Sequence, residues 1–185
     1  ICQGQAIGVQ NNLQGGAFFS NNIFTVQLSN ASGSFASPIV IGVDTTPVAG
    51  SINCIIPANT PAGNAYRVRV LSSHPAAISP ISNTNITIAA ISPPPTVSIS
   101  VSPQGSVLMG TSVTFTATVT NGGTTPQYQW RKNGGNINGA TNSSYTTTTL
   151  VSGDVLDVIV TSALLCAQPM LDTSNAIIMS IITGV

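Results

Sequence analysis

The stretch Val113-Thr-Phe-Thr-Ala-Thr-Val119 decides the fold class of this chain. Its apolar side chains stand at odd positions and its threonines at even positions, which is the period-two pattern of a strand with one buried face. Thr96–Val101 alternates in the same way, with valine or isoleucine at every odd position after Thr96. Thr, Val, Ile and Ser are abundant, whereas Glu is absent and Lys occurs once, so the composition favours strands over helices. The sequence therefore predicts an all-β protein.

Short strands and turns alternate through the second half of the chain. Turn signals stand at Asn121-Gly-Gly123 and Ser152-Gly-Asp154. Further strands are expected at Thr141–Leu150, Val155–Thr161 and Ala176–Ile182. About seven strands at intervals of about 8–12 residues are typical of a β-sandwich. Trp130, the single tryptophan, falls on the third strand, where immunoglobulin-like domains bury one. We expect Trp130 in the core; the alternative is an exposed platform that stacks on sugars.

A block of similar size precedes the proline-rich stretch Ile91-Ser-Pro-Pro-Pro-Thr96. Three consecutive prolines favour extended geometry and form a stiff spacer. In the first block, alternation places these side chains toward a core: Phe24, Val26, Leu28, Tyr66, Val68 and Val70. Arg67 and Arg69 are expected on the solvated face. The sequence thus predicts two tandem antiparallel β-sandwiches of the immunoglobulin-like type, at residues 1–91 and 97–185, with a linker at 92–96.

Charge is nearly absent from this chain. Only 8 of its 185 side chains are charged, four basic and four acidic, and the formal net charge is zero. An average soluble domain has about a quarter of its residues charged. A surface with net charge near zero promotes association. We therefore expect a protein that packs against copies of itself or within a dense extracellular layer.

The same charge count argues against several functions. Nucleic-acid binding needs clustered cations to neutralise phosphates, and the whole basic inventory is Arg67, Arg69, Arg131 and Lys132. The carboxylates are scattered, with no pair for acid–base hydrolysis and no calcium-binding cluster; they are Asp44, Asp154, Asp157 and Asp172. No apolar run approaches the ~18 residues of a membrane span. We expect no catalysis, no cofactor, no metal, no nucleic acid and no membrane span.

Three cysteines leave one without a partner inside the chain. Cys2 and Cys54 lie in the same block, so a Cys2–Cys54 disulfide is favoured. It would contribute on the order of 4 kcal/mol through chain entropy. Cys166 is then a buried free thiol or half of an intermolecular disulfide. The sole histidine, His74, lies in the other block, so neither a Cys–His nucleophile nor a zinc site is expected.

Longer stretches of both blocks resemble repeats of known proteins. Thr25-Val-Gln-Leu-Ser-Asn-Ala-Ser-Gly-Ser-Phe35 and Ile56-Pro-Ala-Asn-Thr-Pro-Ala-Gly63 resemble a repeat of very large secreted surface adhesins, of the gliding-motility type, from bacteria like the Bacteroidetes. Gly110–Thr118 and Tyr128-Gln-Trp130 resemble the immunoglobulin-like or PKD-like repeat of the same proteins. The resemblance implies extracellular display in an adhesin or filament. In the family, a cysteine often occupies the position held here by Leu108 and can pair with that at position 166.

Two functions from different classes follow. The first is a non-enzymatic structural subunit or repeat of a bacterial cell-surface filament or giant adhesin, with copies of itself or neighbouring repeats as partners. The alternative is a carbohydrate-binding or adhesive module, which would expose aromatic rings such as Tyr66, Tyr128 or Tyr145 to surface glycans. Alternation places Tyr66 and Tyr128 with the core, which favours the structural function.

Overall fold

The computed structural model of the chain describes residues 1–11, 18–46, 48 and 50–184, and these divide into two compact units, Ile1–Ile91 and Ser92–Val185. Within this part of the chain the regular structure consists of strands without helices. Most strand pairs are antiparallel, and β10 (Val107–Leu108) with β18 (Ile181–Ile182) is a parallel exception. No helix among the described residues has the length and hydropathy needed to cross a membrane.

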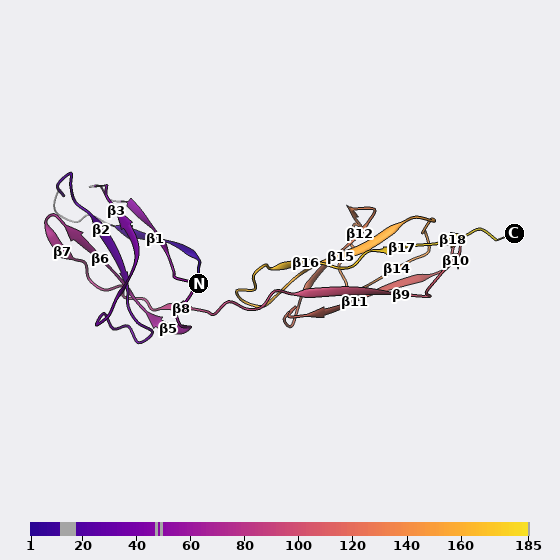
Figure 1. Ribbon diagram of the computed structural model, residues 1–185, viewed down its shortest axis with the longest axis horizontal. Helices are drawn as coiled ribbons and strands as arrows, with labels where there is room; N and C mark the ends of the chain where they lie inside the picture. Colours follow the sequence, from indigo (N-terminus) through magenta and orange to yellow (C-terminus); the bar gives the residue numbers. More distant parts are fainter. Residues whose placement is uncertain (12–17, 47, 49, 185) are drawn as a thin grey trace. The chain divides into compact units, whose positions relative to one another are not determined.

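The first unit is a sandwich of a four-stranded sheet and two pairs of strands (Figure 1). Its strands are β1 (Ala6–Asn11), β2 (Phe24–Leu28), β3 (Ile39–Asp44), β4 (Gly50–Ile55), β5 (Gly63–Tyr66), β6 (Val68–Ser73), β7 (Ala76–Ile78) and β8 (Ile86–Ile88). The larger sheet has the order β3-β2-β6-β7, and the other layer contains the pairs β1-β4 and β5-β8.

The predicted inward positions of the first unit are confirmed. Phe24, Val26 and Leu28 are 2%, 0% and 0% exposed and pack against Ile52 and other core residues of the opposite layer. The residues between them, Thr25 and Gln27, are half-buried on the outer face of β2. Strict alternation is enough to determine which side chains of β2 point inward, because only one face of its sheet packs against the core.

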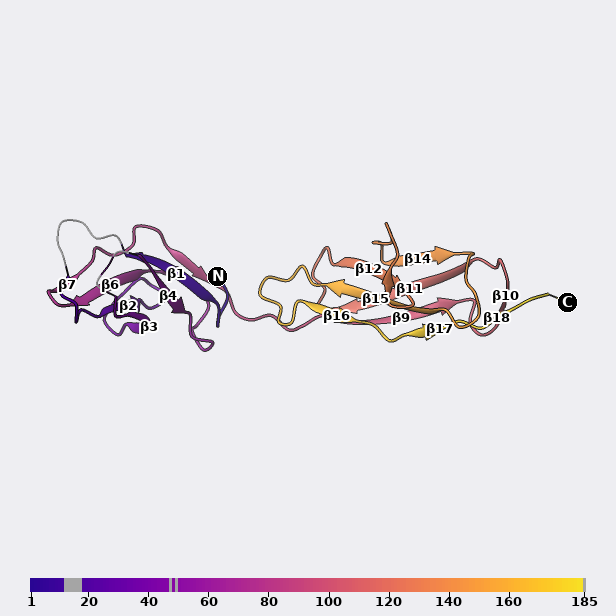
Figure 2. The same cartoon turned by 90° about the horizontal axis from the view of Figure 1, so that it is seen from above.

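The second unit has two sheets and a separate short pair. Its strands are β9 (Thr96–Ser102), β10, β11 (Val113–Thr120), β12 (Gln127–Lys132), β13 (Gly135–Asn136), β14 (Ser144–Thr147), β15 (Val155–Thr161), β16 (Leu171–Thr173), β17 (Ile177–Ile178) and β18. One sheet has the order β14-β11-β9, and the other has β13-β12-β15-β16 with β17 also paired to β15. Figure 2 shows β14, β11 and β9 in this order from top to bottom.

The core of the second unit forms where the two sheets face each other. Val113 and Phe115 of β11, Trp130 of β12 and Val158 of β15 are fully buried. The placement of Trp130 in the core is thus confirmed, with its ring centroid 6.1 Å from that of Phe115. Its Nε1 donates to the carbonyl oxygen of Asn142 at 2.9 Å, so the polar edge of the ring also has a partner.

Two predicted strands are shorter than expected. The Thr-rich segment Thr141–Leu150 forms a strand only over Ser144–Thr147. The segment Ala176–Ile182 is divided into β17 and β18, because Met179 bonds through its backbone N–H to Asp154 and through its C=O to Gly153. Strands of two or three residues, such as β13 and β16, lack a period long enough to recognise in sequence.

Candidate functional site

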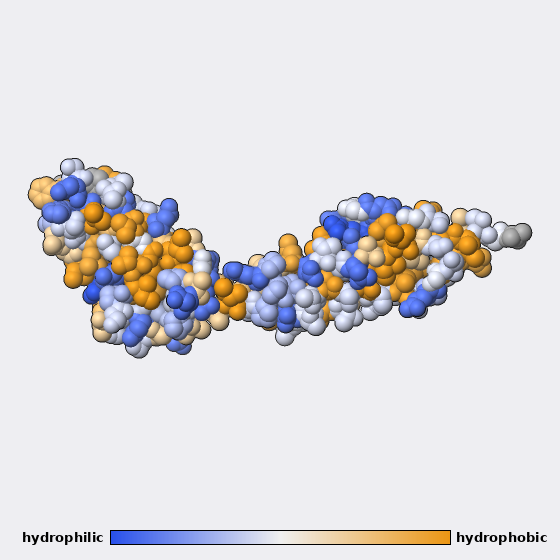
Figure 3. Space-filling view, viewed as in Figure 1, coloured by the Kyte–Doolittle hydropathy of each residue, from blue (hydrophilic) through white to orange (hydrophobic). Residues whose placement is uncertain are grey.

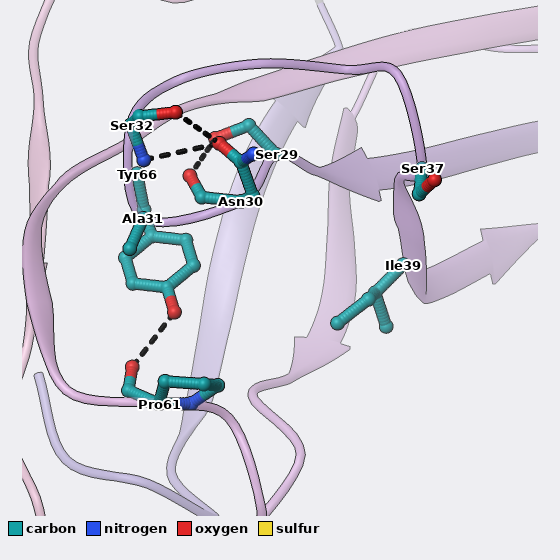
Figure 4. Close-up of a pocket in the computed structure, with 8 residues that line it drawn as sticks. All are labelled: Ser29, Asn30, Ala31, Ser32, Ser37, Ile39, Pro61 and Tyr66. Atoms are coloured by element: carbon teal, nitrogen blue, oxygen red, sulfur yellow. Dashed lines mark hydrogen bonds between the residues drawn. The ribbon is translucent and has the colours of Figure 1, made fainter.

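A pocket of about 380 Å³ lies beside the polar turn that follows β2 (Figure 4). Its lining comes from the turn, from the start of β3, from a loop after β4 and from the end of β5. The lining residues are Ser29, Asn30, Ala31, Ser32, Ser37, Ile39, Pro61 and Tyr66. It is the natural first candidate for a binding site in the first unit.

Asn30 holds the turn beside this pocket. Its Oδ1 accepts hydrogen bonds from the backbone N–H of Ser32 at 3.0 Å and of Ser34 at 2.9 Å, and from Ser32 Oγ at 2.8 Å. Gly33 adopts a φ of 82°, which a side chain would strain, and its N–H donates to the Asn30 carbonyl. The oxygen of the Asn30 amide is therefore occupied within the turn.

Tyr66 forms the apolar wall of the pocket. It is 2% exposed, and its hydroxyl donates to the carbonyl oxygen of Pro61 at 2.7 Å. Burial raises the pKa of this hydroxyl. With the Asn30 oxygen and the Tyr66 hydroxyl both engaged, the pocket presents mainly Ala31, Ile39 and Pro61 to a ligand. It suits a small apolar group and offers no charge to a polar one.

The aromatic rings considered for glycan stacking lie against the cores. Tyr66 and Trp130 are buried. Tyr128 and Tyr145 are half-buried and pack on the core of the second unit, and the Tyr145 ring centroid lies 6.1 Å from that of Trp130. Phe19, by contrast, is 65% exposed. The structure does not gather the three tyrosines on one exposed face.

Two carboxylates of the second unit form ion pairs with β12. Arg131 donates through Nε to Asp157 Oδ1 at 2.7 Å and through Nη2 to Oδ2 at 2.8 Å, a bidentate geometry. The hydrogen bonds from this pair raise the pKa of Arg131. Lys132 lies 3.4 Å from Asp154. Arg131 and Lys132 therefore connect β12 to β15 and to the residue just before it through ion pairs.

Asp154 also closes the turn before β15. Its oxygens accept hydrogen bonds from the backbone N–H of Val151 at 3.0 Å and from Asn133 Nδ2 at 2.9 Å. Burial acts to raise the pKa of Asp154, but these hydrogen bonds and Lys132 outweigh it, so the pKa is lowered from 3.8. A carboxylate held in its ionised form is the opposite of what a general acid needs.

The remaining acidic residues also have structural partners. Asp44 accepts hydrogen bonds from the backbone N–H and the hydroxyl of Thr46. These bonds lower the pKa of Asp44, and the backbone bond has the larger effect. Asp172 accepts from the N–H of Val97 at 2.9 Å. Among the described residues no group of three or more His, Cys, Asp or Glu side chains could hold a metal ion.

Arg67 and Arg69 lie where alternation placed them, away from the core. Arg69 donates to Gln27 Oε1 at 2.8 Å, and its guanidinium carbon lies 4.5 Å from the ring centroid of Phe35. Arg67 donates to Asn85 Oδ1 at 3.2 Å. Both guanidinium groups therefore have neutral partners within the first unit.

The Cys2–Cys54 disulfide expected from sequence is wrong. Cys54 is a free, buried thiol whose Sγ contacts the carbonyl oxygen of Ile52 at 3.4 Å, so the expected Cys2–Cys54 disulfide is not formed. Cys54 lies in the core, paired with Ile7 of β1. Cys2, near the start of the chain, pairs instead through its backbone with Ala89 in an isolated β-bridge. Cys2 and Cys166 are both disulfide-bonded, so Cys166 is not a free thiol. Burial raises the pKa of Cys54 and keeps it protonated.

Polar residues that the sequence did not single out have structural roles. Asn22 is 1% exposed, and its Oδ1 accepts from the backbone N–H of Ser73 at 2.9 Å and of His74 at 2.8 Å. His74 itself is exposed, with Nδ1 3.1 Å from Ser73 Oγ. Asn175 bonds to both backbone groups of Ile99. Nothing in the local sequence marks the partners of Asn22 and Asn175, because their bonds join residues that are more than 50 positions apart.

Comparison with known proteins identifies the fold. No family model matches the sequence, and no curated protein is significantly similar. The chain is similar in structure to a marsupial T cell receptor, with a TM-score of 0.52 and 11% identity over 97% of this chain and 70% of that one. It also matches the four N-terminal immunoglobulin domains of a Dscam1 isoform at a TM-score of 0.37 and 14% identity, covering 97% of this chain and 42% of that one.

A third match is to three N-terminal domains of the outer capsid protein Hoc of bacteriophage RB49. Its TM-score is 0.37 and its identity 14%, over 97% of this chain and 55% of that one. The chain thus spans about half the length of the Dscam1 and Hoc fragments that it matches. Together with the all-β sheets, the similarity to the T cell receptor shows that the chain has an immunoglobulin-like β-sandwich fold.

Proposed function

We propose that the chain is a non-enzymatic extracellular structural protein, a subunit or repeat of a bacterial cell-surface filament or giant adhesin. The observation that carries the proposal is the nearly charge-free surface of two well-packed sandwich units. Only 8 of 185 residues are charged and the net charge is zero. Copies of such a molecule approach one another without the repulsion that keeps most proteins apart.

The partners of the charged groups strengthen this argument. Arg131 and Asp157 neutralise each other, and Asp154 is bonded to Lys132. The outer surface also carries many apolar side chains, shown in orange in Figure 3. Exposed examples are Val40, Val43, Ile55, Ile78, Leu108, Val151 and Ile178. Neutral polar residues interleaved with exposed apolar ones are suited to dense packing against like surfaces.

The roles of the carboxylates support the non-enzymatic part of the proposal. Each of the four aspartates accepts hydrogen bonds within the fold. The donors are backbone groups of turns, a backbone N–H of the edge strand β9, or the guanidinium group of Arg131. The two aspartates with shifted pKa values are both shifted downward. Acid–base catalysis by a pair of carboxylates requires one carboxyl with a raised pKa.

Electron microscopy of the purified chain at high concentration, with and without reductant, tests the proposal. We expect ordered fibres or arrays. Fibres that disappear on reduction would assign the disulfides of Cys2 and Cys166 a role in assembly. A chain that stays monomeric at high concentration, with no fibres, would contradict the filament. Binding on a glycan array by that monomer would favour the carbohydrate-binding alternative.

A further inference from the structure

The two edges of the three-stranded sheet β14-β11-β9 are built differently. An edge strand presents unpaired backbone N–H and C=O groups, which another chain can extend by adding a strand. Proteins that avoid this pairing cover the edge or place charges and prolines on it. In this sheet, β9 is covered and β14 is not.

Side chains close the β9 edge. Asn175 accepts from the N–H of Ile99 at 2.8 Å and donates to its C=O at 3.3 Å, and thereby imitates the two bonds of a neighbouring strand. Asp172 Oδ2 accepts from the N–H of Val97 at 2.9 Å. Both backbone groups of Ile99 and the N–H of Val97, which point outward from β9, are therefore already bonded.

The pairing pattern shows which groups of β14 point outward. The N–H of Ala117 donates to the C=O of Ser143, one register position beyond the paired strands β11 and β14. Hydrogen-bonded pairs alternate in an antiparallel ladder, so Tyr145 and Thr147 bond to β11. The backbone groups of Ser144 and Thr146 then point away from the sheet, and in the described part of the chain no strand pairs with them.

Nothing in the sequence blocks this edge. Residues 133–153 contain no charged side chain and no proline. The side chains of Ser144 and Thr146 are exposed, and Tyr145 is anchored on the core beside Trp130. Lysine and proline are two of the residues with which proteins protect a sheet edge, and this segment has neither.

We propose that β14 pairs antiparallel with β14 of a second copy of this chain. A second copy fits because its edge offers the same alternation of outward groups and the same lack of charge. With a two-fold axis at Tyr145, Ser144 faces the partner's Thr146 and each such pair exchanges two hydrogen bonds. Tyr145 then lies opposite the partner's Tyr145 in a position where cross-strand side chains are close.

This inference rests on the proposed self-assembly and assigns one of its contacts. A two-fold contact closes on itself, so β14 joins two chains side by side, while growth of a fibre needs another contact. The two proposals can therefore fail separately.

Thr146→Lys tests the contact, with Ser98→Lys as its matched control. Both variants add one charge to an exposed position of the same sheet, the first on the open edge and the second on the β9 edge that Asp172 and Asn175 close. In sedimentation equilibrium over a concentration series, we expect wild-type and Ser98→Lys chains to dimerise. Thr146→Lys should weaken dimerisation by at least tenfold. Its circular dichroism spectrum should be unchanged, although the substitution removes the hydrogen bond between the hydroxyls of Thr146 and Thr114.

Thr146→Pro tests the loss of strand pairing without an added charge. The N–H that it removes points outward, and an edge strand tolerates proline at such a position. This variant should also be monomeric and folded. Dimerisation of Thr146→Lys or Thr146→Pro at wild-type strength, equal loss in Ser98→Lys, or a monomeric wild type that adds only a foreign extended peptide would overturn the inference. Fibres that persist in Thr146→Lys without lateral pairing support both proposals.

Discussion

At the scale of single residues, Gly42 shows how closely the edges of the two layers of the first unit approach each other. A Cβ at this position would lie 2.5 Å from Cys54 Sγ and 2.9 Å from the carbonyl oxygen of Asn53. The register of β2 and β3 shifts between Val26 and Gln27, next to Gly42. The glycine therefore allows β3 to pass β4 at contact distance.

We predict that Gly42→Ala lowers the free energy of unfolding by about 1–3 kcal/mol, the usual cost of overpacking. Gly50→Ala is the control, because a Cβ at Gly50 meets no atom within 4 Å. Urea denaturation of both variants gives the comparison. Equal stability of the two would show that β3 and β4 can separate without cost.

Asp154 gives a prediction about pH. Its pKa is lowered in the folded state, so its stabilising effect is complete above the ordinary value of 3.8 and is lost as pH falls through the lower folded pKa. We expect the second unit to lose stability below pH 3.8 and Asp154→Asn to remove part of that loss. Because hydrogen bonds to charged groups contribute about 1.5–3 kcal/mol, Asp154→Asn should be destabilised by about that amount at pH 7. Thermal unfolding at several pH values measures both effects, and a variant as stable as the wild type at pH 7 would count against them.

At the scale of elements, the closed edge of β9 depends on two side chains from a segment about 75 residues later, since the contacts of Val97 and Ile99 span 75 and 76 positions. The double variant Asp172→Ala/Asn175→Ala should therefore expose a second open edge. We predict that it associates more strongly than the wild type and retains association when Thr146→Lys is added. Light scattering over a concentration series measures this association, with Thr173→Ala, at an exposed position of the same segment, as the comparison. No gain in association would show that β9 is protected by other means.

At the scale of the whole molecule, the lack of charge predicts how assembly responds to salt. The screening length falls from about 30 Å at 0.01 M to about 8 Å at 0.15 M, which changes association strongly only when net charges repel or attract. We expect self-association of the wild type to vary less than about twofold over this range. A Thr118→Lys/Ser98→Lys variant, with two added charges, should by contrast associate more weakly at low salt. Sedimentation equilibrium at both salt concentrations measures the self-association of the two proteins. A strong salt dependence of the wild type would contradict a charge-free interface.

Local sequence patterns were sufficient to predict the all-β class, the burial of Trp130 and the inward faces of β2 and β11. These follow from alternation within one strand and from the near absence of helix-favouring residues, both of which are local properties. Two further features depend on the packed structure: Cys54 is a free core thiol, and Asn175 and Asp172 close the edge of β9. The packed structure also leaves β14 open. Disulfides and edge caps join residues far apart in the chain, and their partners are fixed only when the two sheets pack and bring those residues within bonding distance.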